Sequence, residues 1–440
     1  MFSHNLFDSI ILATERDQRL LRCEGRAWNL RFTVWHVTAM AVNVTTMHWN
    51  DTTMFQNLRT VGRNDTSMGE NLEIIRVDQN LRTKEWNVQT VNKGLFGALY
   101  HLSTFYKWMS LEKRIYFTLQ VIQAGYYPFL AVFGVPANVA TIVTLTLRNC
   151  GLSRCVTRYI LAMAAADLLV ILIDLIFRHI PIVYWERFYF LWSFRVCNVH
   201  AVFLYAATDC SVWFTVSFTF DRFVAICCQK LSYKYCTEKV AAVVLGTVAV
   251  VSCFKNIFWY FMLSDRYSVR NTPSFCILTF ATQLSAVWIV IEFLHHMVTP
   301  CVPFVLILLF NVATIRHIVV SSKVRSRLRA NNDAKNSRDS EMESRRKSII
   351  LLFIISLNFI LLWTVLMVYS IWRRTYYLIA DSALMSDVVL EIGFMLQLLS
   401  SCTNTCIYAV TQTIFREQLT NVLKYPFVSI FRCIQRYKNE

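Results

Sequence analysis

The sequence contains none of the short motifs that mark common catalytic and metal sites. It has no H-E-x-x-H, no G-x-S-x-G and no C-x-x-C pair, which are motifs of zinc proteases, serine hydrolases and zinc modules. It shows no internal repeat, and its first residues lack the charged start and apolar centre of a signal peptide. Charged residues are scarce at 16%, whereas hydrophobic residues reach 55% and the mean hydropathy is +0.41. This composition excludes an ordinary soluble domain.

Seven apolar runs are long enough to cross a membrane as helices, because about 20 apolar residues span the hydrocarbon core. Each run is continuous rather than alternating, which favours helices over the strands of a barrel. We therefore predict an all-α membrane protein with a bundle of seven transmembrane helices in 121–411. The predicted spans are 121–147, 157–181, 197–226, 239–263, 287–320, 348–372 and 385–411.

The distribution of lysine and arginine predicts the orientation of this bundle. Twenty of them fall in 148–158, 230–239, 323–347 and 416–438, against six in 187–195, 266–270 and 373–374. Basic residues concentrate on the cytoplasmic side, so we expect the N-terminus outside and the C-terminus inside the cell. The net charge of +16 then reflects topology and contact with anionic lipid rather than nucleic-acid binding.

Residues 1–120 precede the first predicted span and are expected to be extracellular. N-glycosylation sequons begin at Asn43, Asn50 and Asn64, and their clustering on the predicted outer side supports a glycoprotein. The segment is either a poorly ordered ectodomain or an extension that is absent from the mature chain, and both alternatives stay open.

Two of the fourteen cysteines are expected at the outer face. Cys197 begins the third span and Cys276 lies in the loop 264–286, and disulfides persist on that side of a membrane. Most other cysteines lie in apolar runs and are expected to be inert core residues. We predict a Cys197–Cys276 disulfide that ties the loop to the third helix.

The third span carries an ionic element at its inner end, Asp221-Arg222-Phe223. The 25 residues from Cys197 to Arg222 extend about 37 Å at 1.5 Å per residue, which is one full crossing. Charged side chains within a membrane are costly and therefore mark functional sites by default. This helix thus has a thiol at one end of the crossing and an ionic element at the other end. Such an arrangement is expected of a helix that transmits a signal.

Polar side chains at mid-membrane depth recur in four spans. An unpaired amide or carboxylate is costly there. Two interpretations stay open: a site for a small cation or a proton with hard oxygen ligands, or a structural hydrogen-bond network between packed helices. The residues of this polar network are Asn138, Asp167, Ser211, Ser400 and Asn404.

A second group of polar residues predicts a ligand pocket nearer the outer side. Asp174 and Arg178 are i, i+4 partners on the same helical stripe as Asp167, so they form either a cavity wall or a self-neutralising pair. Glu292 and His295 have the spacing of a helical metal pair, but the pair stands alone, so a pocket wall is favoured and no metal is expected. The pocket candidates are Asp174, Arg178, Tyr205, Asp209, Glu292, His295, Arg373 and Glu391.

Two residue pairs at helical spacing and the C-terminal region complete the pattern. Phe359 with Trp363 and Asn404 with Tyr408 each share a helix face at i, i+4. Residues 412–440 predict an amphipathic helix on the membrane surface followed by a short cytoplasmic tail. The polar loop 323–347 contains no aromatic residue and is expected to be flexible.

Together these residues resemble class A (rhodopsin-like) G-protein-coupled receptors over about 120–425. The segments LAMAAADLLV, FDRFVAICCQKLSYKYCTEK, RRKSIILLF and LLSSCTNTCIYAVTQTIFRE look like the orphan receptors of the probable G-protein coupled receptor 139 group, which is associated with aromatic amino acids and peptide-like ligands. The markers of the class are Asn138, Asp167, Cys197, Asp221-Arg222-Phe223, Cys276, Pro303, Phe359 with Trp363, Asn404 with Tyr408, and Phe415-Arg416.

The chain departs from the class at five points, one of which is the absence of the usual fourth-span tryptophan. Val365 and Thr405 stand where the sixth and seventh spans usually carry proline, which changes how these helices bend. Leu204 replaces the aspartate of amine receptors, which disfavours a monoamine ligand. Leu398 replaces the lysine that binds retinal.

The resemblance implies a plasma-membrane receptor, not an enzyme, which couples an extracellular peptide or aromatic amino acid-like ligand to a heterotrimeric G protein. Asp221, Arg222 and Tyr408 would form the coupling element, and Phe359 with Trp363 the switch. No cofactor is expected apart from an allosteric sodium ion at the polar network. The alternative is a polytopic transporter, since mid-membrane polar residues also mark ion pathways, although seven spans without a repeat do not form two equal halves.

Overall fold

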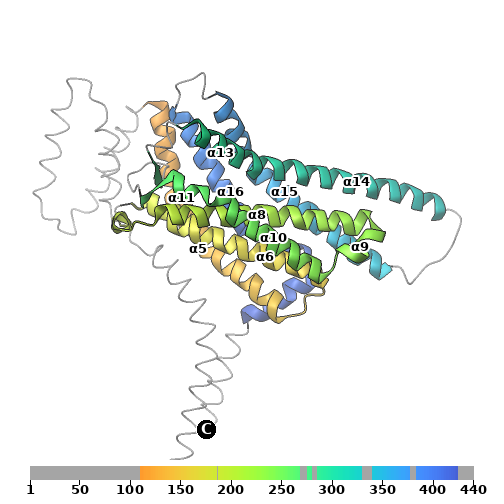
Figure 1. Cartoon of the computed structure of the whole chain (residues 1–440). Helices are drawn as coiled ribbons and strands as arrows, with labels where there is room; N and C mark the ends of the chain where they lie inside the picture. Colours follow the sequence, from red (N-terminus) through yellow and green to blue (C-terminus); the bar gives the residue numbers. More distant parts are fainter. Residues whose placement is uncertain are drawn as a thin grey trace, which may run out of the picture. The chain divides into compact units, whose positions relative to one another are not determined.

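The computed structural model describes residues 110–185, 187–267, 275–279, 285–329, 339–376 and 383–424 (Figure 1). The chain divides into two compact units, Met1–Thr45 with Gln123–Glu440, and Thr46–Ile122. Of the second unit only residues 110–122 are described, and they include the first turns of helix α5 (Leu111–Leu147). The predicted glycosylation sites at Asn43, Asn50 and Asn64 lie outside the described residues.

Within the described ranges, six helical segments are long and apolar enough to cross a membrane. A seventh long helix, α16 (Ala383–Thr411), is continuous but less apolar, because Glu391, Gln397 and Asn404 lie within it. The six segments are α5; α6 (Arg154–Val170) with the π-helical η1 (Ile171–His179) and α7 (Ile180–Val183); α8 (Cys197–Cys227); α10 (Glu238–Asn256) with α11 (Phe258–Met262); α13 (Ala286–His296) with η3 (Met297–Cys301) and α14 (Val302–Arg329); and α15 (Asp339–Tyr376).

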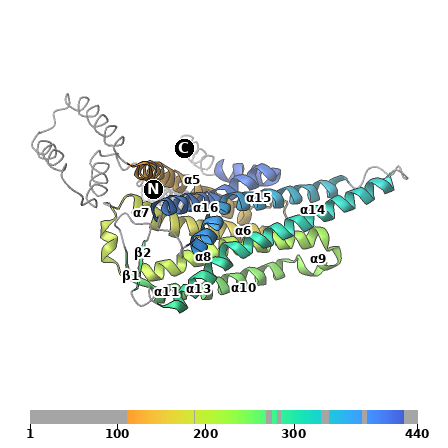
Figure 2. The same ribbon diagram turned by 90° about the horizontal axis from the view of Figure 1, so that it is seen from above.

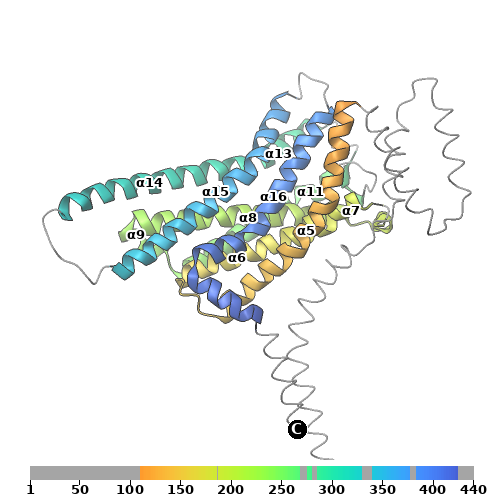
Figure 3. The same ribbon diagram turned by 180° about the vertical axis from the view of Figure 1, so that it is seen from behind.

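Helix α8 lies in the middle of the bundle formed by 123–424. It packs against α6, α10, α14 and α15, and Figures 1 and 2 show it among these helices. Helices α15 and α16 pack along each other, as Figure 3 shows from behind. The short helix α9 (Gln229–Tyr235) follows α8 directly. The predicted all-α membrane bundle is therefore confirmed.

Two apolar clusters hold α5, α6 and α16 together. One includes Tyr159, Phe218 and Tyr408, and the other includes Ile171 and Leu398. In lipid such contacts stabilise helix association through close packing rather than through the exclusion of water.

A further helix covers 413–424. Its Phe415 is buried in the first of these clusters and Leu419 packs on the same cluster, whereas Arg416 and Glu417 are exposed. The predicted amphipathic helix after the seventh span is thus present, and 425–440 lie outside the described part.

Two features of the connecting segments differ from expectation. The prediction of a flexible segment over all of 323–347 was wrong at both ends, because α14 continues to Arg329 and α15 begins at Asp339. These ends contain no glycine or proline and are rich in residues of high helix propensity. The loop 264–286 contains two short strands, β1 (Leu263–Tyr267) and β2 (Cys276–Leu278), which pair antiparallel.

Gly134 marks the closest approach of α5, η1 and α16. A Cβ atom at this position would lie 2.5 Å from Cys402 Sγ and 2.8 Å from Ile171 Cδ1. We expect Gly134→Ala to lower the free energy of unfolding by about 1–3 kcal/mol through overpacking. Thermal unfolding of the detergent-solubilised protein measures this change.

The matched control is Gly246→Ala on α10, where an added Cβ meets no atom within 4 Å. This variant should unfold at the wild-type temperature or above it, because alanine has the higher helix propensity. Equal unfolding temperatures for the two variants would contradict the close packing at Gly134.

Candidate functional site

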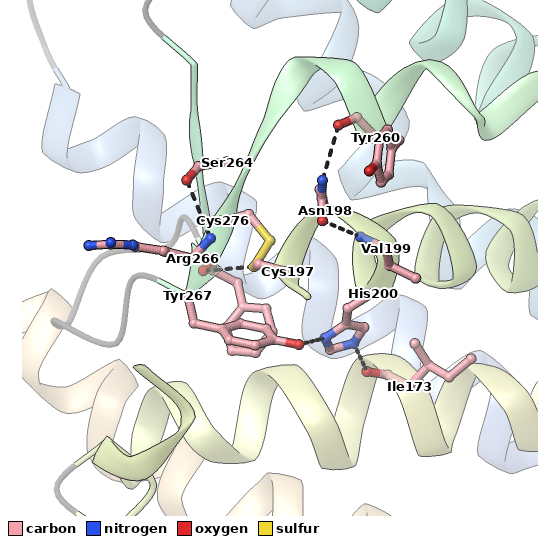
Figure 4. The surroundings of a disulfide bond; sticks show 11 residues. Ile173, Cys197, Asn198, Val199, His200, Tyr260, Ser264, Arg266, Tyr267 and Cys276 are labelled. Carbon is pink, nitrogen blue, oxygen red and sulfur yellow. Dashed lines mark hydrogen bonds between the residues drawn. A yellow bond between two sulfur atoms is a disulfide. The ribbon is translucent and has the colours of Figure 1, made fainter. Parts of the chain in front are cut away.

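A disulfide fastens the β1–β2 hairpin to the start of α8. Cys197 and Cys276 are joined (Figure 4), which confirms the predicted bond. Asn198 Nδ2 also donates a hydrogen bond to the carbonyl oxygen of Tyr260, at 3.3 Å. The hairpin and the end of α11 are therefore both attached to the first turn of α8.

His200 extends this attachment to the second span. Its Nε2 lies 2.8 Å from the carbonyl oxygen of Ile173, and Tyr267 Oη lies 3.4 Å from its Nδ1 (Figure 4). A carbonyl can only accept, so Nε2 carries the proton and Nδ1 accepts from Tyr267. Burial raises the pKa of the Tyr267 phenol, which keeps this donor protonated.

A cavity of about 1050 Å³ lies between α8, α11, α13, η3, α15 and α16. It extends from Cys276 at the disulfide to Trp363 on α15. Its volume is at the upper end of the usual range for small-molecule sites. Six of the eight predicted pocket residues line it, namely Asp174, Arg178, Tyr205, Asp209, Glu292 and His295.

The remaining two pocket candidates are placed differently. Glu391 accepts a hydrogen bond from Gln123 Nε2 at 2.7 Å, which links α16 to α5. The side chain of Arg373 lies outside the described residues. Sequence reasoning missed Gln123, because nothing in the sequence indicates which residue 268 positions away faces Glu391.

One wall of the cavity is built on the π-helical segment η1. Arg178 Nη1 lies 3.0 Å from Asp174 Oδ1, as the i, i+4 spacing predicts. The guanidinium carbon of Arg178 is 4.7 Å from the centre of the Phe394 ring on α16. Arg178 is thus held between a carboxylate and an aromatic face. The charge-assisted hydrogen bond and the cation–π contact both stabilise its positive charge.

The opposite wall is aromatic. Tyr205 of α8 stacks on Trp259 of α11 with ring centres 4.2 Å apart. His295 of α13 meets both rings edge-on, each at 5.3 Å. Three helices therefore contribute one continuous aromatic surface.

An ion pair joins the buried Asp209, next to this wall, to the partly buried Lys255. Lys255 Nζ of α10 is 2.7 Å from Asp209 Oδ2 and 3.0 Å from Thr299 Oγ1 of η3, and the Asn256 amide also donates to Asp209. Sequence reasoning selected Asp209 but missed Lys255. A lysine inside an apolar span was the available signal, since such residues are functional by default.

The mid-membrane polar network centres on Asp167. Ser211 Oγ donates to Asp167 Oδ1 at 2.6 Å, and Asn404 Nδ2 donates to Oδ2 at 2.7 Å. The Ser401 side chain also lies close to the Asp167 carboxylate. The sequence-based prediction was Ser400, which is buried on the same helix. Helical spacing does not distinguish the two serines, because they lie three and four residues before Asn404.

Asn138 joins the network indirectly. Its Nδ2 donates to the carbonyl oxygens of Gly134 at 2.9 Å and Ser401 at 3.0 Å. One helical turn away, the hydroxyls of Thr141 and Thr405 are 2.9 Å apart. Thr405, which replaces the usual proline, therefore ties α16 to α5.

Phe359 and Trp363 lie between the cavity and the α8 core. Their rings stack with centres 5.3 Å apart, and both are buried against Val212, Val216 and Ile307. Trp363 also lines the cavity. A ligand in the cavity can therefore contact the same residue that packs on α8.

The ionic element lies near the end of α8 that is opposite the disulfide, and its two charged residues are paired. Arg222 Nε donates to Asp221 Oδ2 at 2.9 Å, and Cys155 Sγ of α6 donates to Oδ1 at 3.2 Å. Tyr408 is buried against Phe415, and its hydroxyl has no hydrogen-bond partner among the residues described. The structure thus brings Asp221 and Arg222 together but not Tyr408 with them.

The Thr141–Thr405 bond provides a test of helix pairing. We expect Thr141→Val and Thr405→Val each to cost about 1–3 kcal/mol, because each leaves one buried hydroxyl unpaired. The double variant should cost less than the sum, with a coupling energy of about 0.5–1.5 kcal/mol in a thermal-unfolding cycle. Thr146→Val is the control, since that exposed hydroxyl bonds its own backbone. Strictly additive costs would contradict the bond.

A comparison with known protein families identifies the family to which this arrangement belongs. The family described as 7 transmembrane receptor (rhodopsin family) matches residues 137–408, more than half of the chain. The matched segment extends from Asn138 in α5 to Tyr408 in α16 and contains the disulfide, the cavity residues, Asp167 and Asp221-Arg222. Its members are receptors of the plasma membrane, and they cross it several times. The chain therefore belongs to the rhodopsin family of seven-transmembrane receptors.

Proposed function

We propose that the chain couples an extracellular peptide or aromatic amino acid-like ligand to a heterotrimeric G protein. The observation that carries this proposal is the continuity of α8, which borders the cavity at Tyr205 and Asp209 and carries Asp221-Arg222 at its inner end. The 13 residues from Asp209 to Arg222 extend about 20 Å. One rigid element thus connects the ligand cavity to the coupling element.

The proposed orientation places the cavity at the extracellular side. The disulfide lies at the cavity end of α8, and disulfides persist outside the cell. The opposite end meets the loops that are rich in lysine and arginine, as the positive-inside rule requires. Both arguments give an extracellular N-terminus and a cytoplasmic C-terminus.

The proposed ligand class follows from the cavity lining. Tyr205, Trp259 and Trp363 offer aromatic faces, while Arg178 and Glu292 offer groups of opposite charge. A ligand with an aromatic ring, an amine and a carboxylate or amide matches this set. The resemblance to the probable G-protein coupled receptor 139 group supports the same class.

The proposed mechanism is a shift between two conformations. Here Arg222 is held by Asp221. A ligand that contacts Trp363 favours a state in which the inner end of α15 moves away from α8, and a G-protein segment then meets Arg222. The ligand shifts this equilibrium only by the difference between its affinities for the two states.

We also propose a sodium site at Asp167. The carboxylate, Ser211 Oγ and the Ser401 hydroxyl are hard oxygen ligands. Asn138 Oδ1 is buried with no hydrogen-bond partner in the described part of the chain, so it has a free acceptor. These residues would hold the ion, which supplies positive charge beside a buried carboxylate.

Arg222→Ala should reduce ligand-stimulated nucleotide exchange to the basal level, because the cation that meets the G protein is removed. Asp221→Asn should instead raise basal exchange, since Arg222 loses its charged partner. Nucleotide exchange in membranes, normalised to surface expression, measures both changes.

The matched control is Arg158→Ala. Arg158 bonds Glu238 at 2.6 Å near the same end of the bundle, but this pair is exposed and contributes little. Its exchange should match wild type. Full exchange by a surface-expressed Arg222→Ala variant would refute the assigned role.

Sodium chloride should raise the unfolding temperature of the purified receptor by about 2–4 °C for each kcal/mol of binding energy, relative to equimolar choline chloride. Asp167→Asn should abolish this increase, because the carboxylate ligand is lost. Asp174→Asn, a carboxylate change on the same span, should retain it. A sodium effect that survives Asp167→Asn would place the ion elsewhere.

A further inference from the structure

We propose that the Asp209–Lys255 pair forms an inner subsite of the cavity that takes an uncharged hydrogen-bond donor on an aromatic ring, such as an indole N–H or a phenol. The inference deepens the proposed function, since it assumes that the cavity is the ligand site. It adds which part of the ligand enters first and which chemical group that part carries.

Asp209 has one carboxylate oxygen engaged and one available. Oδ2 is held by Lys255 at 2.7 Å and by Asn256. Oδ1 is buried and has no hydrogen-bond partner among the residues that the structure describes. Asp209 lines the cavity and is 1% exposed. A buried acceptor without a donor is costly, so a ligand donor at this atom is strongly favoured.

The charge of Asp209 is already balanced. Lys255 lies on α10 outside the cavity lining and supplies the positive charge from behind. A ligand ammonium here would place a second cation beside the same carboxylate and would lose its own hydration. An uncharged donor gains the hydrogen bond without that cost. The subsite therefore selects against an amine.

The surroundings of Asp209 suit a flat ring. Tyr205 and Trp259 stack 4.2 Å apart and both line the cavity. Thr208 and Trp259 also line it, and their Oγ1 and Nε1 atoms are buried without hydrogen-bond partners within the described ranges. Asp209 is 12 residues beyond Cys197, about 18 Å deeper along α8. The ring therefore enters first, and the charged end of the ligand stays nearer Arg178 and Glu292.

The test uses probes that differ only in the donor. The full-length receptor in lipid nanodiscs is titrated with the isomers 3-methylindole, which keeps the N–H, and 1-methylindole, which lacks it. Tryptamine adds an ammonium. Saturation-transfer NMR, corrected with empty nanodiscs, gives the dissociation constants. We expect 3-methylindole to bind about tenfold more tightly than 1-methylindole, as a hydrogen bond to a carboxylate implies. Tryptamine should bind no more tightly than 3-methylindole.

Variants of the ion pair test whether the preference for 3-methylindole over 1-methylindole comes from Asp209. Asp209→Leu/Lys255→Met removes both charges together and should abolish the difference between the isomers. If this variant does not fold, Asp209→Asn/Lys255→Met is nearly isosteric at position 209 and should reduce the difference, because an amide oxygen is the weaker acceptor. Arg158→Ala, at an exposed residue outside the cavity lining, should leave it unchanged.

Four results would overturn the subsite: no binding of 3-methylindole, equal affinity for the two isomers, tighter binding of tryptamine, or loss of the preference in Arg158→Ala. None of these measurements involves a G protein. Failure of nucleotide exchange and failure of the subsite are therefore distinguishable.

Discussion

The structure depends on the requirement that every charge buried among lipid-embedded helices has a partner. Helix α8 meets this requirement at three depths. Ser211 donates to Asp167, Asp209 pairs with Lys255, and Arg222 pairs with Asp221. Asp167 and Lys255 belong to α6 and α10, and Asp221 also accepts a hydrogen bond from Cys155 of α6, so neighbouring helices hold α8 at each of these depths. A charge left without its partner in this interior would cost several kcal/mol.

The same interactions link residues of the cavity to the packing of α8 against its neighbours. Close-packed interiors switch between discrete arrangements rather than deforming gradually. Trp363 contacts both the cavity and the α8 core. Lys255 connects two cavity-lining residues on different elements, Asp209 and Thr299. In the proposed mechanism, a ligand that displaces either contact would change how α8 packs against its neighbours.

The absence of proline in α15 and α16 gives this member of the family a distinctive seventh helix. Neither helix contains a proline, and both are continuous. Thr405 restores a backbone donor that proline would remove, and its hydroxyl reaches Thr141 on α5. The position thus contributes an interhelical hydrogen bond instead of a bend.

The sequence by itself determined the number and type of the long elements, because continuous apolar runs in a membrane can only be helices. It also determined the disulfide and most cavity residues, since polar side chains are rare there and each one is conspicuous. Only the tertiary structure decided which polar side chains pair with one another. Lys255 for Asp209, Ser401 rather than Ser400 for Asp167, and Gln123 for Glu391 depend on the rotation of each helix about its axis. That rotation follows from packing between distant segments, which local spacing does not encode.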